Sequence, residues 1–154
     1  MVVLSCPGCQ VACVDVVRWV LGYNLYVVSE GLAYRSRQPD VELLDYAVKV
    51  LGVRTVINLR GENPGEPWYD MEAARLGELE ANLINIPMSA SRPPSPQVLL
   101  SLYEAFQSCE YPILIHCQGG ADRTGAAAAI WRMTMLGTPR EEALGELDLS
   151  LIHI

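Results

Sequence analysis

The sequence predicts an α/β fold with a mainly parallel central sheet flanked by helices on both faces. Short apolar runs alternate with longer segments of helical periodicity between about residues 25 and 148. Capping residues precede several of the helical segments, and glycine or proline separates the elements. The chain has 154 residues, of which 51% are hydrophobic and 19% charged. This composition is sufficient for the core of one compact domain.

The first half of this region contains a hairpin, a helix and a buried strand. Gly31 lies in the turn Ser29-Glu30-Gly31 between two short apolar runs, which is typical of a hairpin. Asp40 is a favoured N-cap residue, and Gly52 ends the helix that follows. The expected elements are strands at 25–28 and 32–36, a helix at 41–51 and a strand at 54–59.

The second half repeats the alternation of helix and strand. Ser95 followed by Pro96 predicts a helix N-terminus with proline at its first position. The run Thr138-Pro139-Arg140-Glu141 has the spacing of a capping box and predicts a final helix. The expected elements are helices at 68–76, 96–107, 124–136 and 139–148, and strands at 82–86 and 111–115.

A glycine-rich loop joins the last strand to the alanine-rich helix. Its sequence is His116-Cys117-Gln118-Gly119-Gly120-Ala121-Asp122-Arg123-Thr124-Gly125. Because the loop ends at a helix N-terminus, unpaired backbone N–H groups and the positive end of the helix dipole favour an anion there. A phosphate dianion fits such a site.

Three side chains of the loop are candidates for catalysis. Cys117 is a candidate nucleophile, because backbone N–H groups, the helix N-terminus and a nearby arginine stabilise its reactive thiolate form. Five residues separate Arg123 from the cysteine, so the loop can bring its planar guanidinium back beside the sulfur to hold two equatorial phosphate oxygens. Thr124 can donate a hydrogen bond to the sulfur and ease its departure.

The rest of the loop is expected to shape the phosphate site. Gly119 and Gly120 let backbone amides turn inward without a side chain in the way, and Gly125 relieves crowding where the helix packs. His116 is expected to orient the loop through backbone contacts, although an ordinary core histidine is an equal alternative. The expected phosphate-binding residues are Gln118, Gly119, Gly120, Ala121, Asp122 and Arg123.

The motif His-Cys-x5-Arg-Thr-Gly resembles the signature of the cysteine-dependent protein tyrosine and dual-specificity phosphatase superfamily. The upstream runs 32–39 and 55–62 resemble landmarks of compact microbial dual-specificity-like members, and the resemblance covers residues 24–148. It implies a phosphomonoester hydrolase that acts through a phosphocysteine and needs no metal or cofactor. The implied substrate is a phosphorylated protein or a small phosphomonoester, with phosphotyrosine first and phosphoserine, phosphothreonine or a phosphoinositide accessible if the pocket is shallow.

The general acid departs from the family pattern. Most members carry an aspartate on a separate loop, which here corresponds to residues 87–94 and contains no carboxylate. Asp122 is the expected substitute, as in relatives whose loop ends in Asp-Arg-Thr. Alternatively, Asp122 caps the helix or pairs with Arg123. A third option is a carboxylate from the preceding loop, namely Glu62, Glu66 or Asp70.

The net charge of the chain limits the classes of binding partner that we expect. The net charge is −7 and Lys49 is the single lysine, which argues against broad binding to nucleic acid or anionic membranes. Four arginines could rim the pocket and meet further phosphates, although a solvated surface position is the default for each. These arginines are Arg35, Arg37, Arg60 and Arg92. A phosphoinositide phosphatase therefore stays an alternative.

Two other classes share features with this chain. The missing acid loop is compatible with a phosphate-binding pseudophosphatase that has lost turnover. Sulfur transferases of the rhodanese type also use a loop cysteine, but they typically close the loop with one residue fewer. Cys109 precedes Cys117 by eight residues and could pair with it on oxidation, although we favour an inert thiol.

The two ends are expected to lie outside the domain at 24–148. Residues 1–23 are apolar but interrupted by Asp15 and Arg18, so we expect an amphipathic helix over 11–21 and no membrane insertion. The pair Cys6 and Cys9 has metal-ligand spacing but lacks a second pair, so no metal is expected. Residues 149–154 match what a sequencing adaptor would encode, and we expect a non-native tail. We expect a cytoplasmic protein, and the sequence does not indicate an oligomeric state.

Overall fold

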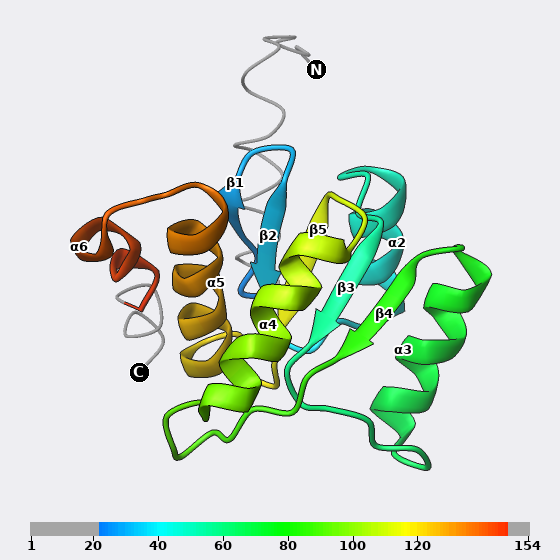
Figure 1. The fold of residues 1–154 in the computed structure, drawn as a ribbon. Coiled ribbons are helices and arrows are strands. Elements are labelled where there is room, and N and C mark those ends of the chain that lie inside the picture. The colour runs from blue at the N-terminus through cyan, green and yellow to red at the C-terminus, as the bar shows by residue number, and fades with distance from the viewer. Residues whose placement is uncertain (1–21, 148–154) are drawn as a thin grey trace, which may run out of the picture.

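The computed structural model describes residues 22–147 and contains one five-stranded sheet with helices on both faces (Figure 1). The strand order is β1-β2-β5-β3-β4. Strand β1 runs antiparallel to β2, and the other three pairings are parallel. The strands are β1 (Tyr26–Ser29), β2 (Ala33–Ser36), β3 (Thr55–Asn58), β4 (Asn82–Asn85) and β5 (Ile113–His116). This confirms the predicted α/β fold with its mainly parallel sheet.

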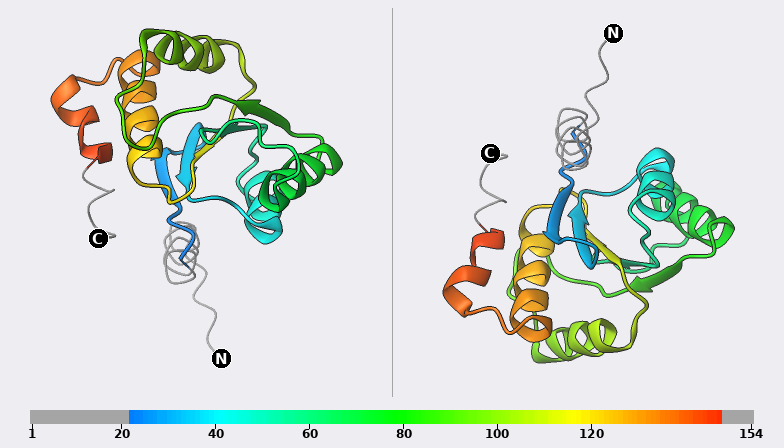
Figure 2. Two further views of the ribbon diagram at one scale, coloured as in Figure 1. Left: turned by 90° about the horizontal axis from the view of Figure 1, so that it is seen from below. Right: turned by 90° about the horizontal axis from the view of Figure 1, so that it is seen from above.

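The helices form a layer on each side of this sheet. Figure 2 shows α2 and α3 together on one face, and α4 and α5 on the other with α6 beside α5. The helices are α2 (Val41–Lys49), α3 (Pro67–Glu78), α4 (Pro96–Ser108), α5 (Asp122–Met135) and α6 (Arg140–Ala143). None of the helices between residues 22 and 147 has the length and apolar character needed to cross a membrane.

Helix starts were predicted well at two positions and wrongly at a third. Asp40 caps α2 by accepting the Leu43 N–H at 2.9 Å, and Ser95 accepts the Val98 N–H at 3.3 Å at the start of α4. Helix α6, however, has Pro139 as its N-cap and no side-chain capping bond. The expected capping box is therefore not formed, since proline occupies the cap position itself.

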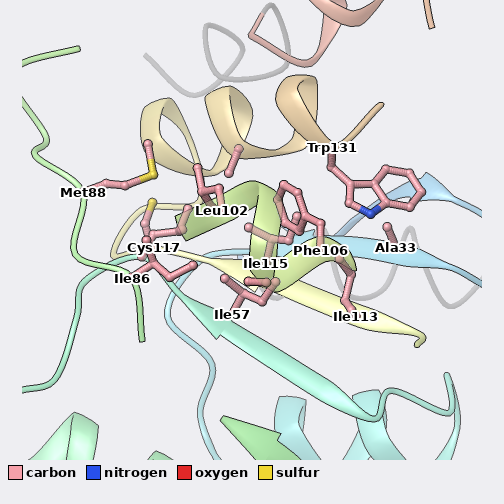
Figure 3. Packing of buried hydrophobic residues seen from close by; sticks show 13 residues of the cluster. Ala33, Ile57, Ile86, Met88, Leu102, Phe106, Ile113, Ile115, Cys117 and Trp131 are labelled. Carbon is pink, nitrogen blue, oxygen red and sulfur yellow. The ribbon is translucent and has the colours of Figure 1, made fainter. Parts of the chain in front are cut away.

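The sheet divides the core into two halves, and strands β2, β3, β4 and β5 each contribute side chains to both of them. In β5, Ile113 and Ile115 pack with Phe106 on the side of α4 and α5, whereas Leu114 packs with Leu43 on the side of α2. This alternation follows from the two-residue period of a strand. Figure 3 shows the first half of the core, which extends to the sulfur of Cys117 at the end of β5.

The register of the parallel strands brings four loops to one edge of the sheet. His116, the last residue of β5, is level with Ser36 of β2 and Asn58 of β3, and Asn58 is level with Asn85 of β4. The segments that follow these residues therefore meet at the carboxyl edge, where ligands bind in open α/β sheets. The expectations for residues 1–21 and 149–154 lie outside the described residues.

Candidate active site

Cys117 lies at the junction of β5 and the loop that leads into α5. Its side chain is 2% exposed, and its Sγ accepts the backbone N–H of Gly120 at 3.2 Å. Helix α5 begins at Asp122, so the sulfur lies beside a helix N-terminus. A backbone donor and the positive end of a helix dipole both stabilise a thiolate more than a thiol.

The loop is held open by donors that surround it. The side-chain amide of Asn24 donates to the Gly119 carbonyl at 2.9 Å, and the Gln38 N–H donates to the Gln118 carbonyl at 3.1 Å. Gly120 has φ of +73°, and a Cβ there would lie 2.5 Å from the Arg37 nitrogen. Carbonyls that point outward leave the amide N–H groups free to face an anion inside the loop.

Arg35 supports the loop from beneath, and so occupies neither the solvated surface position that we expected by default nor the alternative position at the rim of the pocket. It is 1% exposed, and its Nη2 donates to the Gly120 carbonyl at 3.1 Å and the Ala121 carbonyl at 3.3 Å. Its Nη1 contacts Glu146 through the backbone carbonyl at 2.6 Å and the carboxylate at 3.1 Å. Both positions were wrong because strand β2 directs this residue inward, where the buried carboxylate of Glu146 compensates its charge.

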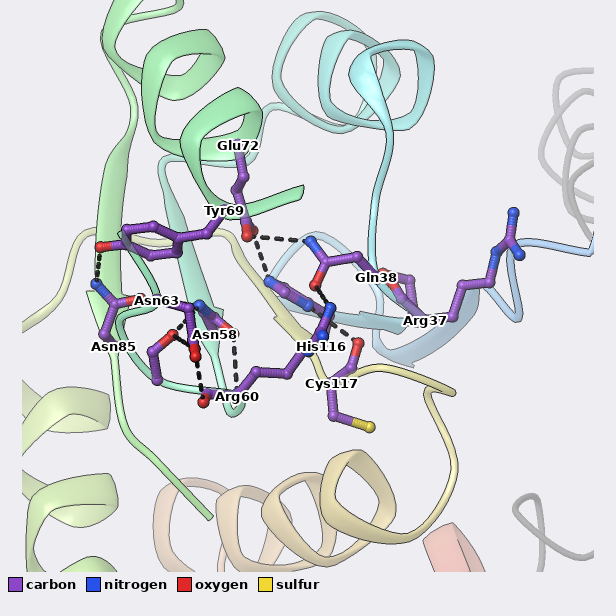
Figure 4. A network of polar contacts seen from close by, with 12 residues as sticks. Arg37, Gln38, Asn58, Arg60, Asn63, Tyr69, Glu72, Asn85, His116 and Cys117 are labelled. Carbon is purple, nitrogen blue, oxygen red and sulfur yellow. Dashed lines mark hydrogen bonds and ion pairs between the residues drawn. The ribbon is translucent and has the colours of Figure 1, made fainter. Parts of the chain in front are cut away.

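A buried polar chain lies behind the catalytic cysteine. Figure 4 shows Glu72 of α3 between Gln38 and His116. Glu72 Oε1 lies 2.6 Å from His116 Nε2, and Glu72 Oε2 accepts from Gln38 at 3.1 Å. The other ring nitrogen, His116 Nδ1, lies 3.2 Å from the carbonyl oxygen of Cys117. The chain therefore runs from helix α3 to the backbone of the nucleophile.

Arg60 continues this chain at the edge of the pocket. Its Nη1 donates to Gln38 Oε1 at 2.9 Å, and its guanidinium stacks on the Trp68 ring at 3.5 Å. Burial lowers the pKa of Arg60, and the charge of Arg123 lowers it further, while Glu72 and Cys117 act in the opposite sense. Arg60 thus lies within electrostatic range of Arg123 and Cys117.

Arg123 lies on the first turn of α5 and faces the segment that replaces the acid loop. Its Nη1 donates to the Met88 carbonyl at 3.5 Å, and the side chains of Met88 and Cys117 lie next to each other in Figure 3. Met88 is 8% exposed, so this segment covers the sulfur with an apolar side chain. Residues 87–94 thus pack against the loop without supplying a carboxylate.

The structure gives the contacts of the two other predicted catalytic residues, Thr124 and Asp122. Thr124 is fully buried, but its hydroxyl has no hydrogen-bond partner among residues 22–147, so the expected bond to the sulfur is not formed. Asp122 is exposed, and Ala121 rather than Asp122 is the N-cap of α5. Within the described part of the chain, Asp122 forms no ion pair with Arg123. Its carboxylate is not engaged in the capping or pairing that we had considered.

The other candidate acids lie on the loop between β3 and α3. Asp70 accepts the Gly65 N–H at 3.1 Å and so stabilises a turn. Glu66 is the N-cap residue of α3 without a side-chain capping bond, and its charge raises the pKa of Arg60. Glu62 is exposed. Asp122 therefore has the best position, since it alone is part of the loop that holds the nucleophile.

The disulfide considered between Cys109 and Cys117 is excluded by the topology. Cys109 ends α4 before β5, and Cys117 follows the last residue of β5. A four-residue strand spans about 13 Å, whereas bridged cysteines have Cα atoms no more than about 7 Å apart. Within residues 22–147, no group of histidine, cysteine and acidic side chains has the geometry to hold a metal ion.

Sequence reasoning missed the buried supports of the site. It assigned no role to Gln38, Glu72 or Glu146, because acidic and amide side chains are most often solvated. One signal was available: Glu72 precedes Leu76 by one helical turn, and both face the interior from α3. The partner of each group lies far away in sequence, so the pairings themselves could not be read from spacing.

Three comparisons with known proteins agree with this geometry. The family model described as "DSP-PTPase phosphatase fused to NAD+ Kinase" matches residues 24–151. Dual specificity protein phosphatase TpbA of Pseudomonas aeruginosa (strain UCBPP-PA14) is 32% identical over 127 residues, which cover 81% of this chain and 53% of TpbA. The chain thus spans about half the length of this curated relative.

Solved structures show the same fold. The catalytic domain of the PP-IP phosphatase SIW14 from S. cerevisiae, in complex with citrate, has a TM-score of 0.67 and 25% identity, covering 82% of this chain and 75% of that one. TpbA from P. aeruginosa in complex with pTyr has a TM-score of 0.65 and 28% identity, covering 82% and 72%. Together with the matching family model, these results confirm the resemblance, and the chain belongs to the tyrosine and dual-specificity phosphatase superfamily, within the DSP-PTPase family just described.

Proposed function

We propose that this domain hydrolyses phosphate monoesters in two steps through a phosphocysteine. The observation that carries the proposal is the position of Cys117 Sγ, which accepts the Gly120 N–H at 3.2 Å at the N-terminus of α5. A nucleophile and an anion-binding loop occupy the same few residues, so a bound phosphoryl group lies next to the sulfur.

In the first step the Cys117 thiolate attacks phosphorus. A P–S bond forms, the bond from phosphorus to the ester oxygen breaks, and the leaving oxygen takes a proton from Asp122. Arg123 and the loop amides hold the equatorial oxygens, where negative charge spreads in the transition state. The assignment of this role to Asp122 is supported by its carboxylate, which is exposed and forms no capping bond.

In the second step water attacks the phosphocysteine. The Asp122 carboxylate accepts a proton from the water, a new P–O bond forms, and the P–S bond breaks to restore the thiolate. Inorganic phosphate leaves. No oxidation state changes in either step, so no redox partner is needed. The proton that Asp122 supplies in the first step returns to it in the second.

Phosphotyrosine is the first substrate class to test. The structure of TpbA in complex with pTyr supports this choice, since TpbA has the same fold and is 32% identical to this chain over 127 residues. Phosphoserine, phosphothreonine and small phosphomonoesters are further candidates. A phosphorylated protein is accordingly the proposed partner.

The proposal is tested by turnover of aryl phosphates with two variants. Cys117→Ser should abolish hydrolysis while a phosphate analogue still binds. Asp122→Asn should slow an ester with a poor leaving group by about 100-fold and an ester with a good leaving group far less, because only a poor leaving group needs the proton.

Other outcomes distinguish the alternatives. A wild-type protein that binds phosphate but turns over none of these esters would be a pseudophosphatase. Equal losses for both leaving groups in Asp122→Asn would remove Asp122 from the role of acid, and the same comparison with Glu62→Gln would then test the neighbouring loop.

A further inference from the structure

Arg35 lies between the phosphate loop and the residues that follow α6. Its Nη2 donates to the carbonyl oxygens of Gly120 and Ala121 at 3.1 and 3.3 Å. Its Nη1 donates to the carbonyl oxygen of Glu146 at 2.6 Å and to the carboxylate of the same residue at 3.1 Å. One rigid, planar guanidinium thus bridges two segments that are far apart in sequence, so the position of one constrains the other.

The loop itself shows how a held carbonyl orients the N–H group of the next residue. In a trans peptide the C=O and N–H bonds point in opposite directions. The Gly119 carbonyl accepts from the Asn24 side chain at 2.9 Å. The N–H of the same peptide, which belongs to Gly120, points to the other side and donates to Cys117 Sγ at 3.2 Å. A donor outside the loop therefore fixes an N–H group that faces the nucleophile.

Arg35 acts in this way on the next two peptides of the loop. Because it holds the carbonyls of Gly120 and Ala121, the N–H groups of Ala121 and Asp122 point away from it. Backbone N–H groups that point to the inner side of such a loop are the donors that a phosphoryl group requires. Asp122 is also the first residue of α5, so its N–H lies at the positive end of the helix dipole.

The buried charge of Arg35 is compensated by Glu146. Both side chains are buried, and their charged atoms lie 3.1 Å apart. No other carboxylate within residues 22–147 lies within ion-pair distance of Arg35. A buried guanidinium without a counter-ion is strongly unfavourable, so the carboxylate of Glu146 keeps Arg35 in place beneath the loop.

The segment that carries Glu146 is itself fixed on α5. Gly125 of this helix makes room for the segment, since a Cβ at Gly125 would lie 2.9 Å from the Glu146 carbonyl oxygen. Arg132 of the same helix contacts Glu146 Oε1 at 3.4 Å and Glu142 Oε1 at 2.6 Å. Glu146 therefore meets Arg35 from a defined position.

We propose that Glu146 is a positioning residue for the phosphate site. Through Arg35 it fixes the N–H groups of Ala121 and Asp122, and so it sets the affinity of the loop for a phosphoryl group in the ground state and in the transition state. A residue remote from the nucleophile in sequence thereby controls how well the loop is formed. The inference rests on the proposed phosphatase function and adds to it a residue outside the loop.

The test compares Glu146→Ala and Glu146→Gln with a matched control, Glu142→Ala. Glu142 belongs to the same segment and shares Arg132 as a partner, but the ion pair of Arg35 is with Glu146. Two quantities are measured well below the unfolding transition: the Kd of inorganic phosphate by calorimetry and kcat for an aryl phosphate. The free energy of unfolding in urea is measured separately for each variant, so that a loss of folded protein is not mistaken for a weaker site.

Glu146→Ala should weaken phosphate binding and lower kcat, each by about tenfold, because two N–H donors are no longer held in position. Glu146→Gln should lose about fivefold, since its amide oxygen still accepts from Arg35, and it takes the place of Glu146→Ala if that variant does not fold. Glu142→Ala should change neither quantity by more than about twofold. A purely structural role would lower the free energy of unfolding and leave both quantities unchanged in the folded protein.

A double-mutant cycle tests whether Glu146 acts through Arg35. Arg35→Lys keeps the charge, but an ammonium cannot reach all of the acceptors at once, so we expect a loss of phosphate affinity similar to that of Glu146→Ala. Adding Glu146→Ala to Arg35→Lys should then weaken binding by no more than about twofold further. Losses that multiply fully would show that Glu146 acts independently of Arg35 and would overturn the inference. If Arg35→Lys does not fold, the comparison of the Glu146 and Glu142 variants still decides.

Two further results would overturn the inference: a phosphate affinity and a kcat that stay within about twofold of the wild type in the Glu146 variants, or equal losses in Glu146→Ala and Glu142→Ala. Failure of the proposed function is a different result. The wild type would then bind phosphate without turning over the ester, and the binding comparison between the variants would still test Glu146. A wild type that binds no phosphate would exclude both.

Discussion

Two cysteines flank strand β5, and their surroundings differ in almost every respect. Cys109 precedes the strand at the C-terminal end of α4, and burial raises the pKa of its thiol. Cys117 follows the strand at the N-terminal end of α5 and accepts a backbone N–H. One thiol is at the negative end of a helix dipole and the other at the positive end.

The comparison predicts that the reactivity of a thiol here depends on whether backbone donors stabilise its thiolate, and not on its exposure alone. Cys109 is the more exposed of the two residues, yet its environment favours the neutral thiol. The hollow near it, lined by residues that include Thr55, Cys109 and Glu110, lies at the end of the sheet away from the phosphate loop. A parallel sheet collects donors for anions at its carboxyl edge, and the nucleophile belongs to that edge.

The largest contrast is expected from replacing each cysteine by serine. Cys117→Ser should lower kcat for an aryl phosphate by about 10⁴-fold or more, because a serine hydroxyl is not ionised at neutral pH. Cys109→Ser should keep kcat within about twofold. A steady-state assay measures kcat for both variants. A similar loss of kcat in the two would contradict the different roles assigned to the two cysteines.

Arg123→Lys should lower kcat/KM by about 10³-fold. The ammonium keeps the charge but cannot bind two equatorial oxygens at once as the planar guanidinium does. Arg54→Lys at the opposite edge of the sheet provides the matched control and should leave kcat/KM unchanged. If Arg123→Lys retained full activity, the assigned role of the bidentate contact would be wrong.

Alanine substitutions at two adjacent glycines of the loop distinguish the effect of backbone strain from that of a simple loss of chain flexibility. Gly120→Ala should reduce the free energy of unfolding by about 2–4 kcal/mol, because φ is +73° and the new Cβ would lie 2.6 Å from the Ser36 carbonyl carbon. Gly119→Ala meets no atom within 4 Å and should change it by less than about 1 kcal/mol. Urea denaturation measures both, and equal effects would contradict the loop geometry.

The smallest effect concerns alkylation of the thiols. At neutral pH, iodoacetamide should modify Cys117 at least about tenfold faster than Cys109, as followed by peptide mapping. Because the pKa of Cys109 is raised, little of its thiolate is present at neutral pH. The rate at which Cys109 is alkylated should therefore increase as the pH rises above the ordinary pKa of a thiol. Faster alkylation of Cys109 than of Cys117 at neutral pH would contradict this prediction.

The fold followed from local signals that tertiary structure did not override. Asp40 and Ser95 cap their helices as expected, and the alternating apolar residues of β5 enter the two halves of the core. The error at α6 arose because Thr138 and Glu141 have the spacing of a capping box, while Pro139 occupies the cap. Spacing alone does not decide which residue begins a helix.

The site could be predicted only where its residues are contiguous. Cys117 and Arg123 belong to one loop whose spacing indicates the chemistry. Arg35, Glu72 and Gln38 act through partners far along the chain, and burial reverses the usual expectation for charged residues. The inward direction of Arg35 depends on how β2 pairs with β5, which a pattern of residue types does not specify.

The most direct test of the central claim is to trap the covalent intermediate. Wild-type protein is mixed with an aryl phosphate, quenched in acid within the first turnover and digested for mass spectrometry. The account predicts one added phosphoryl group on the peptide that contains Cys117 and none on the peptide that contains Cys109. Turnover with an unmodified Cys117 peptide, or a phosphoryl group found on another residue, would contradict it.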